Sequence, residues 1–225
     1  MSQEPDPNDL DGLIRRVDPD RWMSSRFIAD GADRADVITL YAFDHELARA
    51  PKVASNPLMG EIRLTWWREV LDEVEAGKAV RQHPTALALA ELMSRQGLDR
   101  GALEALIDAR YRELDAEPMT LDEAMVWARE TGGGVAAIAA SLLDPAAEPK
   151  LARAGGTAWA IGRLMRTAGL SGPEAMAALK SERLAARGLS AAAFPAIAHA
   201  SLAPDGGSDL SRQGRLVWAV LRGRI

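Results

Sequence analysis

Apolar residues recur every three or four positions along most of the chain, and no stretch sustains the period-two alternation typical of a β-strand. Between residues 33 and 50, for example, Val37, Leu40 and Leu47 fall at helical spacing, and Pro51 follows them. Frequent Ala, Leu, Arg and Glu also favour helix. The pattern predicts an all-α fold with about eight or nine helices.

Capping residues and breakers indicate where these helices begin and end. Asp18 followed by Pro19 is typical of a helix start, and the helix is expected to run to about residue 29. Thr120 and Glu123 have the spacing of a capping box, ahead of an apolar run that ends at Leu143. Similar signals, including a second capping box at Ser171 and Glu174, predict helices over 84–97, 99–117, 149–169, 171–188, 193–203 and 210–225. A polar loop is expected at 204–208.

The segment NPLMGEIRLTWWREVLDEVEAG, residues 56–77, places two tryptophans side by side in a helical pattern. Its apolar residues form two stripes about 100° apart, one containing Trp66 and the other Trp67. We therefore expect this helix to be buried on two sides. Arg63 lies one turn before Trp67 and is placed to stack on it. The two stripes are Ile62, Trp66, Val70 and Val74, and Leu64, Trp67 and Leu71.

Length and charge narrow the class of protein. The 225 residues suit one substantial core, so we expect a single helical domain over 18–225, preceded by an acidic, proline-containing flexible segment over 1–17. The formal net charge of −5 argues against nucleic acid as a partner. The chain has no cysteine, no secretory leader and no apolar stretch long enough for a membrane span, so a cytoplasmic location is expected.

Three groups of residues suggest chemistry, and each also has a structural interpretation. Asp44, His45 and Glu46 are consecutive, so on a helix they point about 100° apart and do not converge on one ion; a solvated face is favoured. A second group, with acids and an arginine on one helical face, indicates either a salt-bridged surface or the wall of a cleft. Its members are Glu104, Asp108, Arg112 and Asp115.

The third group is the glycine run at 131–134, TGGG, which lacks the Lys-Ser/Thr of a phosphate-binding loop. Close helix packing or a helix bend is the favoured interpretation. The arginines around LVWAV, residues 216–220, indicate either docking of the last helix on the core, which is favoured, or contact with an anionic membrane surface. Catalysis by His45, His83 or His199 is not expected, because none has a triad-like context.

Taken in order, LYAFDHELARA, LMGEIRLTWWREVLDEVEAG, LIDARYREL, TLDEAMVWARETGGGVAAIAA and GTAWAIGRLMRTAG resemble the squalene/phytoene synthase family over residues 20–205. The resemblance implies an isoprenoid (terpenoid) synthase-like helical bundle with a central apolar cavity. It further implies that catalytic members use two Asp-x-x-x-Asp motifs to hold Mg²⁺, which binds a substrate diphosphate.

This chain departs from both motifs. At the first, Asp44 is present, but Ala48 stands where the second aspartate is expected and Glu46 is a displaced acid. At the second, Thr167 follows Arg166, and no acid occurs before Glu174. The remaining acids are therefore regarded as vestigial candidates for catalysis: Asp44, Glu46, Asp108 and Asp115. The candidates for contacting an anionic ligand are Arg49, Arg112 and Arg166.

These departures resemble the branch of the family that includes an assembly factor for respiratory complex I. The leading expectation is a non-catalytic member without a metal cofactor, which binds a protein partner or a lipid or isoprenoid and assists assembly of a membrane complex, in the cytoplasm or peripheral to the membrane. The alternative is a prenyl-diphosphate transferase whose Mg²⁺ is held by an irregular shell of Asp44, Glu46, Asp108 and Asp115. A third interpretation is a bundle whose ancestral cavity is filled by side chains.

Overall fold

The computed structural model describes residues 6, 8–54, 56–203 and 208–225, which form α-helices and short helical turns with no strand in these ranges. The all-α prediction is confirmed. The helices are α1 Leu10–Val17, α2 Pro19–Ser25, α3 Gly31–Lys52, α4 Pro57–Glu75, α5 Pro84–Gln96, α6 Arg100–Ala109, α7 Leu121–Ala128, α8 Gly134–Leu143, α9 Pro149–Thr167, α10 Pro173–Ala185 and α11 Asp209–Arg222. Shorter 3₁₀ turns are η1 Tyr111–Leu114, η3 Phe194–Ala196 and η4 Ala198–Leu202, and η2 Arg129–Gly133 is π-helical.

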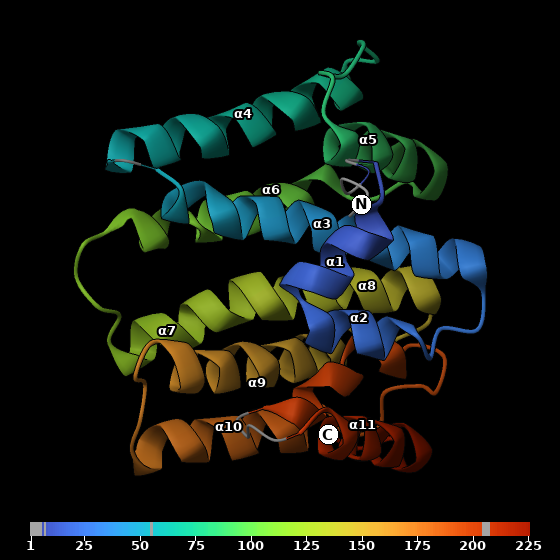
Figure 1. The fold of residues 1–225 in the computed structure, drawn as a ribbon, viewed down its shortest axis with the longest axis vertical. Helices are drawn as coiled ribbons and strands as arrows, with labels where there is room; N and C mark the ends of the chain where they lie inside the picture. The colour runs from blue at the N-terminus through green and yellow to red at the C-terminus, as the bar shows by residue number, and fades with distance from the viewer. Residues whose placement is uncertain (1–5, 7, 55, 204–207) are drawn as a thin grey trace, which may run out of the picture.

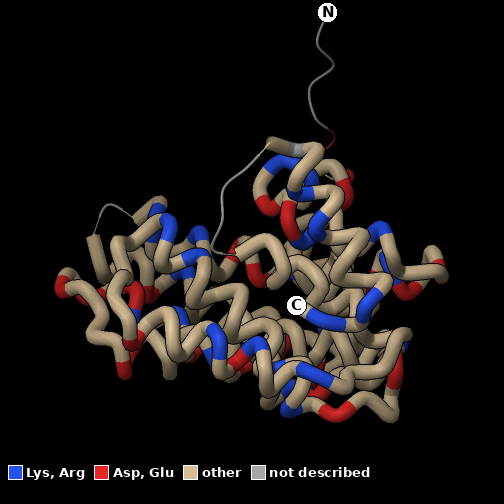
Figure 2. The backbone as a smooth tube through the Cα atoms, turned by 90° about the horizontal axis from the view of Figure 1, so that it is seen from below, with Lys and Arg blue, Asp and Glu red and all other residues tan. Residues whose placement is uncertain are grey.

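The helices stack in layers around α3 and α9 (Figure 1). One end of the stack is formed by α4 and α5, followed by α3 and α6, then by α7, α8 and α9, and the other end by α10 and α11. The core contains the buried face of α3, which includes Leu40, Phe43 and Leu47. Acidic and basic positions are interspersed along the backbone (Figure 2). No helix within the described residues is long and apolar enough to cross a membrane.

Several predicted helix ends are confirmed by the caps. The Asp18 side chain accepts a hydrogen bond from the Arg21 backbone N–H, with Pro19 in the first turn. Thr120 and Glu123 form a complete capping box at the start of α7. Gly97 ends α5 in the left-handed conformation that favours glycine.

Other boundaries differ from the prediction. The capping box expected at Ser171 and Glu174 is wrong, because Gly172, with φ of 109°, precedes α10 and supplies no side-chain cap. The helix expected over 99–117 ends at Ala109 and continues as η1. The helix expected over 193–203 consists of η3 and η4.

The predicted flexible segment over 1–17 also differs from the structure in its second half. Residues Leu10–Val17 form α1, capped by Asp9, and the fully buried Ile14 of this helix joins the core. Residues 1–5 and 7 lie outside the described part of the chain, as do positions 204–207 of the expected polar loop.

The tryptophan pair is buried on one side rather than two. Trp67 is buried against Phe43, with ring centroids 5.3 Å apart, whereas Trp66 is half-buried and meets Trp67 edge to face. Ile62, at the N-terminal end of the stripe of Trp66, is 52% exposed, whereas Val70 of the same stripe is fully buried. The prediction of burial on two sides is therefore wrong for the N-terminal half of that stripe. The guanidinium that lies over Trp66 comes from Arg81, at 5.4 Å from the ring centroid.

The glycine run provides close helix packing, as predicted. A Cβ added to Gly132 would lie 2.7 Å from the backbone oxygen of Gly156 on α9 and 2.8 Å from the Ala160 methyl group. The backbone is π-helical over the same residues, which lets α7 and α8 continue as one curved unit along α9.

Candidate functional site

Asp44 on α3 is held between two arginines in the interior of the bundle. Arg21 of α2 donates through Nη1 to Asp44 Oδ2 at 2.5 Å, and Arg110, which follows α6, donates through Nη2 to Asp44 Oδ1 at 2.5 Å. The three side chains are almost completely buried, and Asp44 is only 4% exposed. The expectation that residues 44–46 form a solvated face is therefore wrong for Asp44, because α2 and α6 cover this part of α3.

The two guanidinium groups determine the ionisation of the site. Burial alone would raise the pKa of the Asp44 carboxyl, but attraction to Arg110 and Arg21 and hydrogen bonds from both outweigh it and hold this pKa well below its usual range. Burial likewise opposes the charge on each arginine, and Asp44 restores it, so the pKa values of Arg21 and Arg110 are raised. Asp44 is therefore ionised, and its charge is already neutralised by protein groups.

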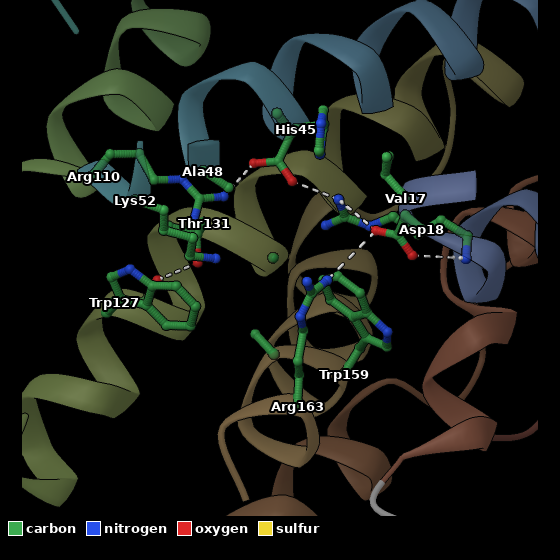
Figure 3. A pocket seen from close by; sticks show the side chains of 14 residues that line it. Val17, Asp18, His45, Ala48, Lys52, Arg110, Trp127, Thr131, Trp159 and Arg163 are labelled. Atoms are coloured by element: carbon green, nitrogen blue, oxygen red, sulfur yellow. Dashed lines mark hydrogen bonds and ion pairs between the residues drawn. The ribbon is translucent and has the colours of Figure 1, made fainter. Parts of the chain in front are cut away.

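A small pocket of about 60 Å³ opens beside this cluster, between α2, α3, η2 and α9 (Figure 3). Its lining contains more cations than anions. Asp18 and Asp44 face Arg21, Lys52, Arg110 and Arg163. Arg163 Nη1 lies 3.7 Å from Asp18 Oδ2, and Arg21 Nη1 is also 3.7 Å from that oxygen. The lining therefore favours a small anionic group.

Two indole rings form the walls of the pocket. The Arg21 guanidinium carbon lies 4.0 Å from the ring centroid of Trp159, and that of Arg163 lies 5.3 Å from the same ring. The Arg110 guanidinium carbon lies 5.6 Å from the ring centroid of Trp127. Cation–π contacts of this kind fix the guanidinium planes. His199 is buried next to Trp159, and the centroids of the two rings lie 5.2 Å apart.

A larger open cleft of about 740 Å³ adjoins the pocket, because Lys52 lines both. Its apolar walls come from α7, the C-terminal end of α9 and the turn after α9, and include Leu121, Leu164 and Leu170, whereas η1 contributes the charged Arg112 and Glu113. A cleft of this volume is in the range of small-molecule sites in proteins. The two hollows together place a cationic end beside a longer, mainly apolar one.

The other acids predicted from the sequence do not join Asp44. Glu46 pairs with Arg49 at 3.5 Å and lines a separate surface hollow with Trp66. Asp108 pairs with Arg68 outside the pocket. Asp115 lies on the rim of the cleft. The face from Glu104 to Asp115 is mainly a salt-bridged surface, and only its C-terminal end lines the cleft.

The three predicted ligand arginines are also separated. Arg49 lies at the surface hollow. Arg112 lines the cleft, where Asp115 at 3.4 Å and Glu123 at 3.2 Å engage its guanidinium. Arg166 Nη2 lies 3.6 Å from Asp20 Oδ2. Among these three, only Arg112 lines one of the two adjoining hollows.

The side chains around Asp44 do not fit Mg²⁺. This ion requires several oxygen ligands in an octahedral arrangement. The pocket offers the carboxylates of Asp18 and Asp44, but both Asp44 oxygens accept from arginines. Oδ2 of Asp18 lies 3.7 Å from the same Arg21 Nη1 and 3.7 Å from Arg163 Nη1. Within the described ranges, no group of three or more His, Asp or Glu residues is placed to hold a metal ion. The irregular shell of Asp44, Glu46, Asp108 and Asp115 is not assembled.

Sequence reasoning missed the arginines that hold Asp44. Arg21 lies in a short helix with no marked periodicity, and Arg110 lies in LIDARYREL, where only Asp108 and Arg112 were selected. The available signal was the excess of arginine in the segments that flank the retained aspartate. Pairing over sequence separations of 23 and 66 residues becomes visible only in the folded chain.

Comparison with known proteins adds three results. The family model for squalene/phytoene synthase matches residues 14–203. A dehydrosqualene synthase crystal structure with a ligand superposes with a TM-score of 0.72 and 12% identity, covering 95% of this chain and 94% of that one. A squalene synthase from Alicyclobacillus acidocaldarius superposes with a TM-score of 0.61 and 17% identity, covering 95% and 88%. At these identities the superpositions show the isoprenoid synthase fold alone.

Two curated relatives are named as assembly factors rather than as synthases. Over 103 residues the chain is 27% identical to NADH dehydrogenase (ubiquinone) complex I, assembly factor 6 from Bos taurus and 26% identical to the Homo sapiens protein. The match covers 46% of this chain and 30% of each relative. The chain thus aligns with less than a third of the length of these assembly factors.

Proposed function

This chain belongs to the squalene/phytoene synthase family, and we propose that it is a non-catalytic member that binds an anionic isoprenoid or lipid and acts in the assembly of a respiratory membrane complex. The observation that carries the proposal is the state of Asp44. Its charge is neutralised by Arg21 and Arg110, at the position where catalytic relatives are expected to bind Mg²⁺.

Catalysis of diphosphate departure requires stabilisation of the negative charge that develops on the leaving group. In this family that role falls to Mg²⁺ held by carboxylates. Here the only acid of the first motif is occupied by arginines, Ala48 lines the pocket where a second carboxylate is expected, and Thr167 replaces the acid of the second motif. The site therefore has cations of its own and too few oxygen ligands for the ion.

The same cations suit an anionic head group. Arg163 and Lys52 line the pocket together with Arg21 and Arg110, and the mainly apolar cleft continues from Lys52. An amphiphile with a phosphate head and a long apolar chain matches this arrangement in charge and in shape. Since the pocket itself measures only about 60 Å³, the apolar chain must lie in the cleft.

The role in assembly is supported by the relatives named as complex I assembly factors. An assembly role needs a binding surface rather than turnover, which agrees with a site whose acids are engaged in ion pairs. A pull-down from cells of the source organism should recover respiratory complex subunits, and their repeated absence would count against this part of the proposal.

The catalytic alternative is tested directly. The purified protein is incubated with farnesyl or geranylgeranyl diphosphate and Mg²⁺, and release of inorganic pyrophosphate and formation of an apolar product are measured. We expect neither above the rate without protein. Turnover that is lost in Asp44→Ala, but retained in the surface variant Asp108→Asn, would overturn the proposal.

The ligand is tested by mass spectrometry of protein that has been extracted gently, without strong detergent. A retained isoprenoid or phospholipid of constant mass is expected. Protein that carries no ligand in any preparation would contradict occupancy of the cleft. The assembly role would still be tested separately, by the pull-down.

A further inference from the structure

The last helix of the chain has an apolar face that points away from the protein. On α11, Leu216 and Ala219 are buried against the body of the bundle, and Arg212 pairs with Asp20 of α2. The opposite side carries Leu210, Val217, Trp218 and Leu221, which are 79%, 44%, 56% and 75% exposed. We call these four residues the outer α11 face.

Helical geometry makes the outer α11 face continuous. Its residues are spaced at i, i+7, i+8 and i+11, and at 100° per residue they fall within a sector of about 100°. The remaining position within this sector is Gly214, beside which no other part of the protein lies within 4 Å. Four large apolar side chains in one stripe differ from the isolated exposed apolar residues that any surface carries.

Positive charge borders this face. The segment 209–225 contains four arginines and one aspartate, whereas the whole chain has a formal net charge of −5. The Arg222 guanidinium carbon lies 4.0 Å from the ring centroid of Trp218, and both Arg222 and Arg224 are exposed. Within the part of the chain that the structure describes, neither has a carboxylate partner. In Figure 2 the chain end marked C adjoins one of the basic segments.

We propose that the outer α11 face docks the protein on an anionic lipid surface, with Leu210, Val217, Trp218 and Leu221 entering the interface and Arg222 and Arg224 contacting lipid phosphates. Helices with an apolar face that includes Trp and Leu, bordered by basic residues, lie in the plane of the membrane interface. A partner protein with an apolar surface would explain the exposed leucines but not the basic residues that border them. The adjoining unpaired arginines favour lipid phosphate.

The structure confirms the core docking that the sequence favoured for the last helix, and the inference adds a second role for its opposite side. Core docking and membrane contact were treated as alternatives for the last helix, but the helix presents a different face to each. Leu216 and Ala219 anchor it to the bundle, and the outer α11 face is left for the membrane. The inference does not depend on a ligand in the pocket, so each of the two proposals can fail alone.

Co-sedimentation with vesicles tests the proposal. The purified protein is mixed with vesicles of phosphatidylcholine alone or with one third phosphatidylglycerol, at low and at high salt. We expect binding to the anionic vesicles and weaker binding at high salt. Leu221→Asp should lower the apparent affinity at least tenfold, and Arg222→Gln and Arg224→Gln should each lower it about fivefold.

The matched control is Leu58→Asp, which places the same charge at a leucine of α4 that is 63% exposed. Circular dichroism and thermal melting establish that each variant is folded. Absence of binding to anionic vesicles, or equal losses in Leu221→Asp and Leu58→Asp, would refute the proposal. Light scattering that shows a dimer dissociated by Leu221→Asp, with vesicle binding unchanged, would assign the face to a second copy of the chain instead.

Discussion

Both oxygens of Asp44 accept a hydrogen bond from an arginine, so removal of this carboxylate leaves two buried guanidinium groups with only Asp18 and Glu113 to balance their charge. Breaking a buried ion pair by removing one member costs about 3–5 kcal/mol. We expect Asp44→Asn to lower the free energy of unfolding by about that amount, measured by urea denaturation at pH 7.

The matched control is Asp108→Asn. Asp108 also pairs with an arginine, but its side chain is 59% exposed. An exposed pair contributes about 0–1 kcal/mol, so the control should change stability little. Equal and small effects of the two substitutions would show that Asp44 is not the structural centre of the site.

The buried His199 makes the free energy of unfolding depend on pH. Burial, with a smaller contribution from Arg21, lowers the pKa of His199 well below 6.5. Below pH 6.5 the unfolded chain binds a proton at this residue that the folded chain does not, so the free energy of unfolding falls as pH decreases from about 6.5. His45, whose pKa burial also lowers, acts in the same direction.

The quantity to measure is the slope of the free energy of unfolding against pH. Between pH 7 and 5, His199→Gln should lose free energy of unfolding less steeply than the native protein, by up to about 1.4 kcal/mol per pH unit. A constant offset from altered packing does not change this slope. Parallel curves for the two proteins would contradict a neutral buried His199.

The sequence identified Asp44 as a candidate residue but did not reveal what surrounds it. The resemblance identified Asp44, Ala48 and Thr167 as positions of interest. Periodicity could not reveal that α2 and α6 cover Asp44, because the contacts that bury it join segments far apart in the chain.

For the face from Glu104 to Asp115, charge spacing left a salt-bridged surface and a cleft wall open. Local pairs at Glu104 and Asp115 agree with the first interpretation. The pairing of Glu104 and Asp108 with Arg68 of α4 is long-range and became visible only in the folded chain.

η2 and α9 are in such close contact that one added methyl group should disturb their packing. A Cβ on Gly156 would overlap the backbone oxygen of Gly132 and lie 2.6 Å from the Ala136 methyl group. The backbone at Gly132 cannot move aside without separating η2 from α9. Gly156→Ala should therefore destabilise the fold by several kcal/mol, as overpacking does.

The control for that substitution is Gly214→Ala, in the middle of α11. No neighbouring part of the protein lies near this glycine, and its φ is not positive. Alanine in an open helical position should therefore raise the free energy of unfolding by about 0.5–1 kcal/mol. Thermal melting of both variants should give shifts of opposite sign. Tolerance of Gly156→Ala would show that the helices are not held together at this point.

At the scale of elements, helix type was predictable and helix ends were predictable only where side chains supply the cap. Asp18, Thr120 and Gly97 end or start helices through their own chemistry, and each was predicted. The start of α10 depends instead on the backbone of Gly172, which a capping-box pattern at Ser171 and Glu174 does not encode. The glycine run at 131–134 indicated close packing or a bend, but the π-helical form of η2 was not predicted.

The layered bundle places a cationic pocket and an apolar cleft side by side, with Lys52 shared between them. Family resemblance predicted the bundle, because its motifs occur in order through most of the chain. The volume of the pocket was not predictable, since it depends on Arg21, Arg110 and Trp159 meeting from three elements. Under the proposed function, the molecule differs from catalytic members of the family in the contents of the site more than in its architecture.

If protein cations bind the head group directly, ligand binding should not require Mg²⁺. We expect farnesyl diphosphate to raise the melting temperature equally with Mg²⁺ and with EDTA, by roughly 5–10 °C at a hundred times its Kd. A metal-dependent site would lose the shift in EDTA. Arg163→Gln should reduce the shift in either buffer, because Arg163 lines the pocket and is partly exposed, so its loss is compatible with folding. Arg49→Gln, in the separate hollow beside Trp66, should leave the shift unchanged. A shift that depends on Mg²⁺ and is insensitive to Arg163→Gln would favour the prenyl-diphosphate transferase over the binding protein.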